Sequence, residues 1–172
     1  MNAPIQGNQQ APSPQLAATQ QLKSGANWFY WIAGLSVVNS VIAVAGGDWY
    51  FIIGLGMNHL VNGIISAATP GGYSNADAIA IAIGLIFNVL IAGLFALFGY
   101  LANKRFKWAF ITGMILYTFD GLLFLIVSDF LSIGFHIFAL YGMYRGFTGL
   151  QKLERLQSEV VISQIQIPPP IK

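Results

Sequence analysis

The stretch YTFDGLLFLIVSDFLSIGFHIFALYGM, residues 117–143, decides the fold class of this chain. It is almost entirely apolar, yet it carries Asp120 and His136 inside its apolar runs and the dipeptide Ser128-Asp129 between them. About 20 helical residues, each rising 1.5 Å, are enough to cross the roughly 30 Å hydrocarbon core of a bilayer. The stretch therefore predicts two antiparallel membrane-spanning helices joined by a tight turn, with Asp129 able to cap the second helix.

The composition of the whole chain supports the same class. Charged residues make up 8% of the sequence, against about 25% in an ordinary soluble domain, while 56% of the residues are hydrophobic. The mean hydropathy is +0.66. We therefore predict an all-α integral membrane protein whose partners are the lipid bilayer and other membrane proteins or a second copy. Nucleic acid is excluded as a partner because no basic stripe is present, and the absence of cysteine excludes disulfides and thiolate chemistry.

Five apolar segments follow one another along the chain. Helix is the only structure open to each of them, because lipid offers no partner to unpaired backbone groups. We predict a bundle of five transmembrane helices, built from two tight helical hairpins, the first with the second segment and the fourth with the fifth, around a third segment rich in small residues. The predicted spans are residues 28–45, 49–68, 78–102, 108–127 and 130–149.

The two ends of the chain are predicted to lie outside this bundle. Residues 1–27 are rich in Gln, Ala, Pro and Ser, which indicates a disordered polar tail. A cleavable signal peptide is the alternative, because AVAGG at 43–47 resembles a cleavage site. Residues 150–172 are predicted to be a cytoplasmic amphipathic extension of the last helix followed by a Pro-rich tail. Its helical part places Leu150, Leu153, Leu156 and Val160 on one face.

The basic residues predict an orientation. Seven of the eight follow the third segment, three of them at 104–107 and the others from Arg145 onward. Basic loops stay in the cytoplasm, so we expect the 103–107 loop and the C-terminus on that side of the cell (inner) membrane. Five spans then place the N-terminus and Lys23 outside. If 49–68 is instead re-entrant, four spans place every base inside; we expect five.

Small residues predict how the helices pack, because helices in lipid associate through close contact of their backbones. The third segment carries the clearest stripe, at intervals of three or four residues: Ala80, Gly84, Asn88, Ala92, Ala96 and Gly99. The first and fifth segments offer similar sets: Ala33, Ser36, Ser40 and Ala43, and Ser132, His136, Ala139, Gly142, Gly146 and Gly149.

The ionisable residues of the opening stretch form the candidate site. Asp120 and His136 both lie about 10 Å from the same turn on two antiparallel helices, so they are predicted to meet. Two interpretations stay open: a structural clasp between helices, or a proton or ion site, since ionisable groups inside a membrane usually have a function. The full set of candidate intramembrane polar residues is Asp120, His136, His59, Asn62, Asn58, Asn88 and Asn39.

These observations predict the function only as a class. The chain has no G-x-S-x-G motif and no phosphate-binding loop, so we expect no enzyme activity and no cofactor. The leading hypothesis is a non-enzymatic accessory subunit or scaffold of a membrane complex that binds partners through small-residue helix faces. The alternative is a small transporter or proton-conducting protein that uses Asp120 and His136. A third hypothesis is a metal- or cofactor-binding membrane protein with His59, His136 and Asp120 as ligands, although no closely spaced metal motif supports it.

Overall fold

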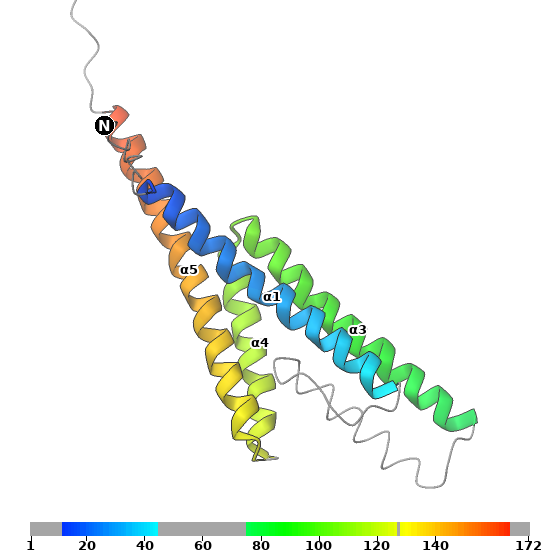
Figure 1. Ribbon diagram of the computed structural model, residues 1–172. Coiled ribbons are helices and arrows are strands. Elements are labelled where there is room, and N and C mark those ends of the chain that lie inside the picture. Colours follow the sequence, from blue (N-terminus) through cyan, green and yellow to red (C-terminus); the bar gives the residue numbers. More distant parts are fainter. Residues whose placement is uncertain (1–11, 45–74, 127, 166–172) are drawn as a thin grey trace, which may run out of the picture.

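The computed structural model describes residues 12–44, 75–126 and 128–165 of the 172-residue chain. These residues form four helices: α1 (Pro14–Val44), α3 (Asn75–Asn103), α4 (Lys107–Ile126) and α5 (Phe130–Ile165) (Figure 1). The predicted all-helical class is confirmed. Five transmembrane helices are not supported, and the segment at 49–68 that would supply the fifth lies outside the described residues. Two described helices, over Ala82–Asn103 and Lys107–Ile126, are long and apolar enough to cross a membrane.

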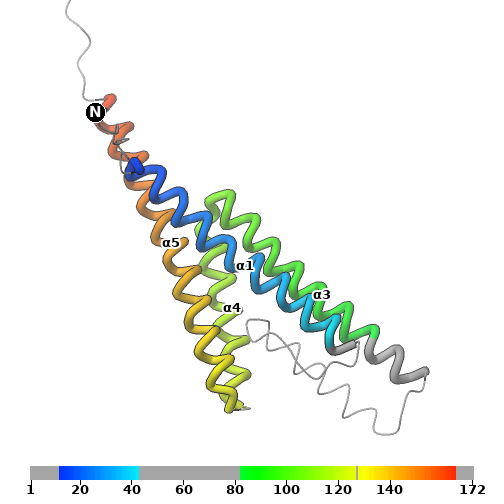
Figure 2. Tube along the Cα trace, in the orientation of Figure 1, coloured from blue at the N-terminus to red at the C-terminus, as the bar shows by residue number. Residues whose placement is uncertain are grey.

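The described helices run alternately up and down, and α1 makes the most extensive contacts. It packs against α5 and against α3, while α4 packs against α5 and more sparingly against α3 (Figure 2). The sequence placed the small-residue-rich third segment at the centre of the bundle, but among the described helices α1 holds that place. The reason lies in its 31-residue length, which lets one helix follow α5 in its first half and α3 in its second.

The direction of α1 bears on the predicted topology. Its Phe29 lies against Phe98 near the C-terminal end of α3, and Figure 1 shows that α1 and α3 run in opposite directions. Consequently Val44 and Asn75 lie at the same end of the bundle (Figure 1). Leu22 lies beside Gly149, and Lys107 pairs with Glu154, so Lys23 and the 103–107 loop lie at the same end of the described bundle. The five-span prediction, which would place them on opposite sides of a membrane, is not supported.

The first helix begins well before its apolar segment. Ser13 accepts a hydrogen bond from the Leu16 backbone N–H at 3.3 Å and Pro14 takes the first helical position, an arrangement typical of a helix start. The prediction of a disordered tail is therefore wrong for residues 14–27. Their buried face consists of small or medium side chains, Ala18, Leu22 and Ala26, which the polar composition of the segment conceals.

Beyond the α3–α4 turn, the start of α1 lies beside α5, and α5 then continues past the start of α1 (Figure 1). Leu150 and Leu153 of α5 are buried, whereas Val160 is exposed. The Gln21 amide donates to the Arg145 carbonyl oxygen at 2.8 Å and to the Thr148 hydroxyl at 3.0 Å. The predicted helical continuation of the last segment is thus confirmed as far as Ile165, and only the Leu150 and Leu153 end of its predicted apolar face is buried.

The two described turns share one geometry. Arg105 and Ser128 have positive φ angles, 69° and 55°, and each follows the end of a helix. The next residue donates its N–H to a carbonyl five positions back: Phe106 to Leu101 and Asp129 to Phe124, both at 3.1 Å. This is the Schellman end of a helix. Asp129 then begins α5, accepting from the Ser132 N–H at 3.2 Å, so its predicted capping role is confirmed.

Phe29 forms the aromatic centre of the core. It is fully buried, and its ring lies 5.9 to 6.4 Å from the rings of Phe95, Phe98 and Phe110 on α3 and α4. Two glycines make room for it: a Cβ at Gly113 would lie 2.8 Å from its Cζ, and one at Gly99 would lie 3.2 Å from its Cβ. One side chain of α1 thereby fixes the separation of α3 and α4.

The small-residue stripe of the third segment faces inward. Gly84, Asn88, Ala92 and Gly99 are buried and Ala96 is half-buried, while the side chain of Ala80 is outside the described set. The sequence predicted that partner proteins bind to small-residue faces of this kind. At these positions of α3 the small-residue face instead packs inside the bundle.

Candidate functional site

The α4–α5 hairpin brings Asp120 and His136 together, as their equal distance from the turn predicted. The His136 Nε2 lies 3.1 Å from the Asp120 Oδ2. Both side chains are buried, with 3% of His136 and 4% of Asp120 exposed. Of the described side chains that are both buried and ionisable at ordinary pH, these two form the one close pair of opposite character.

Aromatic rings and a glycine enclose the imidazole. The Tyr117 ring stacks on it, with ring centres 4.3 Å apart and planes inclined by 16°. Phe124 lies 5.1 Å away at an angle of 50°. Gly121 completes the enclosure, because a Cβ there would lie 2.9 Å from the His136 Cδ2. The ring is therefore held in one orientation by packing as well as by its hydrogen bonds.

The second ring nitrogen of His136 is also engaged. Its Nδ1 lies 2.9 Å from the backbone carbonyl oxygen of Ser132, one turn earlier on α5. The Ser132 hydroxyl donates to the Asp129 Oδ2 at 2.5 Å. The chain of contacts thus runs from the capped start of α5 through Ser132 and His136 to Asp120 on α4.

Two buried polar atoms lack a hydrogen-bond partner within the described part of the chain: the Tyr117 hydroxyl and the Asn88 Oδ1. Tyr117 stacks on His136. Its ring also lies 6.0 Å from that of Phe95, and Asn88 lies about two turns before Phe95 on α3. One of these atoms therefore belongs to the residue that stacks on His136, and the other lies on the neighbouring helix α3.

The other candidate residues are placed only in part. Asn39 is buried on α1 with Ser36 and Ser40. Ten residues separate it from Phe29, about 15 Å along the helix, so it reaches the level of Asn88 on the antiparallel α3. Asn58, His59 and Asn62 lie outside the described residues. Of the seven candidates, the structure brings Asp120 and His136 into contact.

A metal site has no support within the described residues. They contain no group of three His, Cys, Asp or Glu side chains that could hold an ion. The third ligand of the hypothesis, His59, belongs to the part that is not described, so the structure places no ligand set around Asp120 and His136.

Sequence reasoning missed the groups that position the pair. Tyr117 lies three residues before Asp120 and the Ser132 carbonyl four residues before His136, so helical spacing around each candidate would have found both. Gly121 and Gly25 carried no signal of their own. No protein family, curated protein or solved structure matches this chain, so the geometry alone supports the proposals below.

Proposed function

We propose that this chain is a small multi-pass membrane protein without enzyme activity that acts as an accessory subunit or scaffold by binding other membrane proteins. The observation that carries the proposal is the contrast between its two kinds of glycine. Inward glycines such as Gly25, Gly113 and Gly146 are used for close packing within the chain, whereas Gly34, Gly93 and Gly134 face outward with nothing within 4 Å of a Cβ position.

A glycine on the outer face of a helix is unfavourable in itself, because glycine destabilises a helix by about 1 kcal/mol relative to alanine. An outward glycine leaves a gap in the surface of its helix, here called a notch. In lipid, a notch lets the backbone of a second helix approach closely. On α3 the notch at Gly93 lies in a seam of exposed large side chains with a three- and four-residue spacing. The seam consists of Ile86, Leu90, Gly93, Leu97 and Tyr100.

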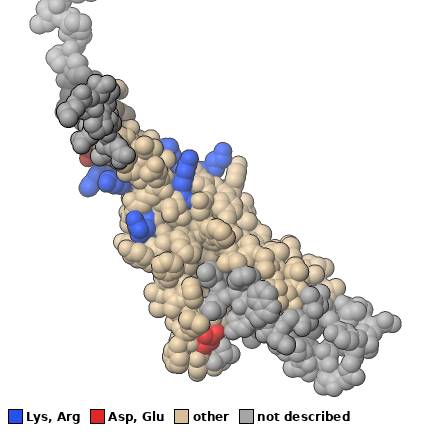
Figure 3. All heavy atoms as spheres, in the orientation of Figure 1, with Lys and Arg blue, Asp and Glu red and all other residues tan. Residues whose placement is uncertain are grey.

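The expected orientation rests on the distribution of charge. The Lys107–Glu154 ion pair joins the α3–α4 turn to α5, and the Gln21 hydrogen bond joins the start of α1 to Arg145. The described bases lie at one end of the molecule, and a small acidic spot lies away from them near the α4–α5 turn (Figure 3). We propose that α1 and α5 cross the membrane with α3 and α4, and that the basic end is cytoplasmic.

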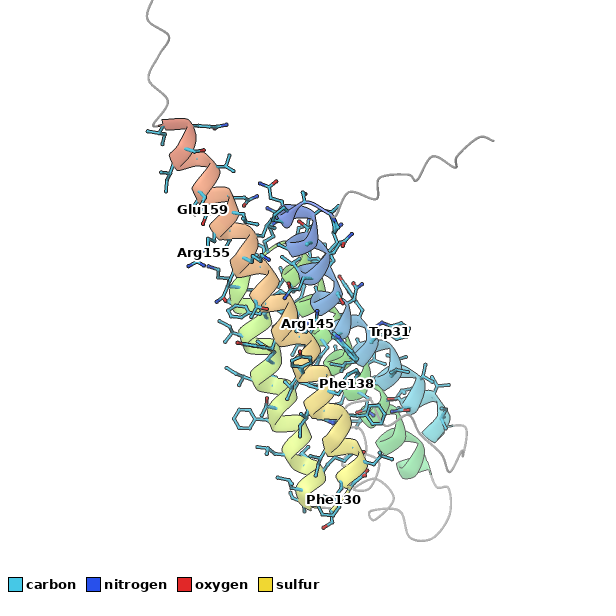
Figure 4. All side chains as sticks on the ribbon, turned by 60° about the vertical axis from the view of Figure 1, so that its left-hand side comes forward. Trp31, Phe130, Phe138, Arg145, Arg155 and Glu159 are labelled. Atoms are coloured by element: carbon cyan, nitrogen blue, oxygen red, sulfur yellow. The ribbon has the colours of Figure 1, made fainter. Side chains whose placement is uncertain are left out.

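Single cysteines test this orientation, since the chain has none of its own. Gln20→Cys and Gln157→Cys are expected to resist a membrane-impermeant maleimide in intact cells and to react after lysis. Phe130→Cys, at the foot of α5 (Figure 4), is the control and is expected to react from outside. Labelling of Gln20→Cys from outside while Gln157→Cys stays protected would restore the five-span topology.

Photo-cross-linking tests the binding role. A photoreactive residue at Leu90 or Leu97 is expected to form a cross-linked product in native membranes, with a partner protein or with a second copy. The variant Gly93→Leu is expected to abolish that product without changing the stability of the purified protein, because the space beside Gly93 is open. The same residue at Leu122 of α4, also exposed, is the control position. A product that persists in Gly93→Leu, or equal products at all three positions, would refute the proposal.

The binding role is proposed ahead of transport because of how Asp120 and His136 are packed. A transporter or proton-conducting protein requires a water-accessible cavity at the pair, and both side chains are almost completely buried and enclosed by rings. Their arrangement supports a clasp between α4 and α5.

A further inference from the structure

A cavity opens on one side of α1, next to its interface with α5, where Trp28 lies against Phe138 with ring centres 5.3 Å apart. Its volume of about 330 Å³ is within the usual range for sites that bind small ligands. The described residues that line it follow one another along α1: Ser24, Asn27, Trp28, Trp31 and Leu35. The cavity is therefore polar at the end nearer the start of α1 and apolar at the other end.

The polar groups of this cavity make no hydrogen bond with any described residue. The hydroxyls of Ser36 and Thr118 bond to a carbonyl one turn earlier on their own helices, but among the described contacts the Ser24 hydroxyl has no such bond. The same is true of the Asn27 amide and of the Trp28 indole N–H. These groups are available to a ligand in the cavity.

A positive charge lies at the level of the polar end. Gly25 and Gly146 pack backbone to backbone, so Arg145 of α5 stands within about one turn of Ser24. The Arg145 side chain is exposed and makes no ion pair within the described part of the chain. Figure 4 shows Arg145 and Trp31 on the same side of the helix pair.

These groups match the chemistry of a phospholipid. A guanidinium presents a planar fork of N–H donors that fits a phosphate, and an indole N–H can only donate. Tryptophan is enriched at the depth of the lipid headgroups, and Arg145 is the first Lys or Arg of α5 after its apolar part. The donors therefore lie where a membrane has phosphate, and the apolar end of the cavity lies where it has acyl chains.

We propose that this cavity binds an anionic phospholipid, with its phosphate between Arg145 and the side chains of Ser24 and Asn27, and with one acyl chain along Trp31 and Leu35. A zwitterionic lipid is disfavoured because no described carboxylate lines the cavity to receive its ammonium group, and because the described bases gather at this end of the molecule (Figure 3). The site rests on the membrane crossing of α1 and α5 proposed above.

Lipid binding by the purified protein tests the proposal. Native mass spectrometry of the protein in detergent micelles measures its affinities for phosphatidylglycerol and phosphatidylcholine with identical acyl chains. The wild type is expected to bind phosphatidylglycerol about tenfold more tightly, as a charge-assisted hydrogen bond allows. Arg145→Gln is expected to remove this preference. Arg155→Gln, the same change at another exposed arginine of α5 (Figure 4), is the control and is expected to retain it.

A second variant tests the position of the phosphate from the other helix. Ser24→Glu places a carboxylate beside Arg145, where it repels a phosphate, and is expected to weaken phosphatidylglycerol binding about tenfold. Gln157→Glu changes the net charge equally at an exposed site of α5 and is expected to leave binding unchanged. Equal affinities of the wild type for the two lipids, or equal losses in a variant and its control, would overturn the proposal.

Cross-linking of an otherwise unchanged protein covers the case in which these variants do not fold. A photoreactive residue at Trp31, whose side chain is 65% exposed, is expected to capture anionic phospholipid in excess of its share of the native membrane. The exposed Leu122 of α4 is the control and is expected to capture lipids in proportion to their abundance. Proportional capture at both positions, or a product at Trp31 with protein alone, would overturn the proposal.

Failure of the site is distinguishable from failure of the proposed topology. Outside labelling of Gln20→Cys with Gln157→Cys protected would refute the crossing of α1 and α5. Equal affinities for the two lipids in a protein that labels as expected would refute the lipid site and leave that crossing intact.

Discussion

Replacing Gly146 by alanine is expected to destabilise the protein by about 2 kcal/mol or more, because it forces α1 and α5 apart. A Cβ at this position would lie 2.5 Å from the Cα of Gly25, and a Cβ at Gly25 would come closer still to the Cα of Gly146. Both obstacles are backbone atoms, so no side chain can rotate out of the way. The two helices must separate along their whole interface, including the part beyond the α3–α4 turn.

The chain provides its own controls for this substitution. Gly93→Ala and Gly134→Ala make the same chemical change on helices where the added methyl meets nothing. Because alanine favours helix over glycine, these variants are expected to be as stable as the wild type or up to about 1 kcal/mol more stable. Unfolding in mixed detergent micelles measures all of them. A loss of similar size at Gly93 and Gly146 would show that the α1–α5 contact is not the cause.

Phe29→Ala is expected to cost about 3–5 kcal/mol, the range for emptying the site of a large buried aromatic residue. The Phe29 ring contacts both α3 and α4. Gly99 and Gly113 already allow close approach to this side chain, so neither helix can easily move inward to fill the space that the ring leaves. Phe119→Ala on α4 is the control. Its side chain is 63% exposed, so the same truncation is expected to change stability by less than about 0.5 kcal/mol.

A double substitution distinguishes the loss of this contact from general damage. In the wild type, Gly113→Ala is expected to be destabilising, because the new methyl meets the Phe29 ring. In the Phe29→Ala background the methyl enters the vacated space, and the second substitution is expected to cost nothing further. Additive costs would mean that Phe29 does not occupy the notch at Gly113.

The sequence was sufficient for those features that depend on short-range geometry. Asp120 and His136 could be paired because a tight turn puts residues at equal distances from it at the same depth, whatever the rest of the fold does. Asp129 could be assigned as a cap from its place in front of an apolar run. Both inferences involve one hairpin and need no knowledge of other helices.

Features that depend on the path of the whole chain could not be predicted in this way. Hydropathy measures whether a segment can enter lipid but not whether it passes through, so the five predicted crossings did not follow from it, and the four described helices do not support them. The extent of α1 was missed because residues 14–27 pack through Ala18, Gly25 and Ala26, whose contribution is close approach rather than apolar surface. Ser13 followed by Pro14 is typical of a helix start, but the prediction gave more weight to the polar composition of residues 1–27.

The pairing of α1 with α5 also has a consequence for how the protein is made. Gln21 and Thr148, which bond across this interface, are 127 residues apart in the chain. Ribosomes add about 5–20 residues per second, so roughly 6–25 seconds pass between the synthesis of one partner and that of the other. Throughout that interval the first helix has left the ribosome without the surface against which Gly25 packs. Helix α1 must therefore remain without its α5 contacts until α5 has been made, and the α1–α5 interface is the last of its helix contacts to form.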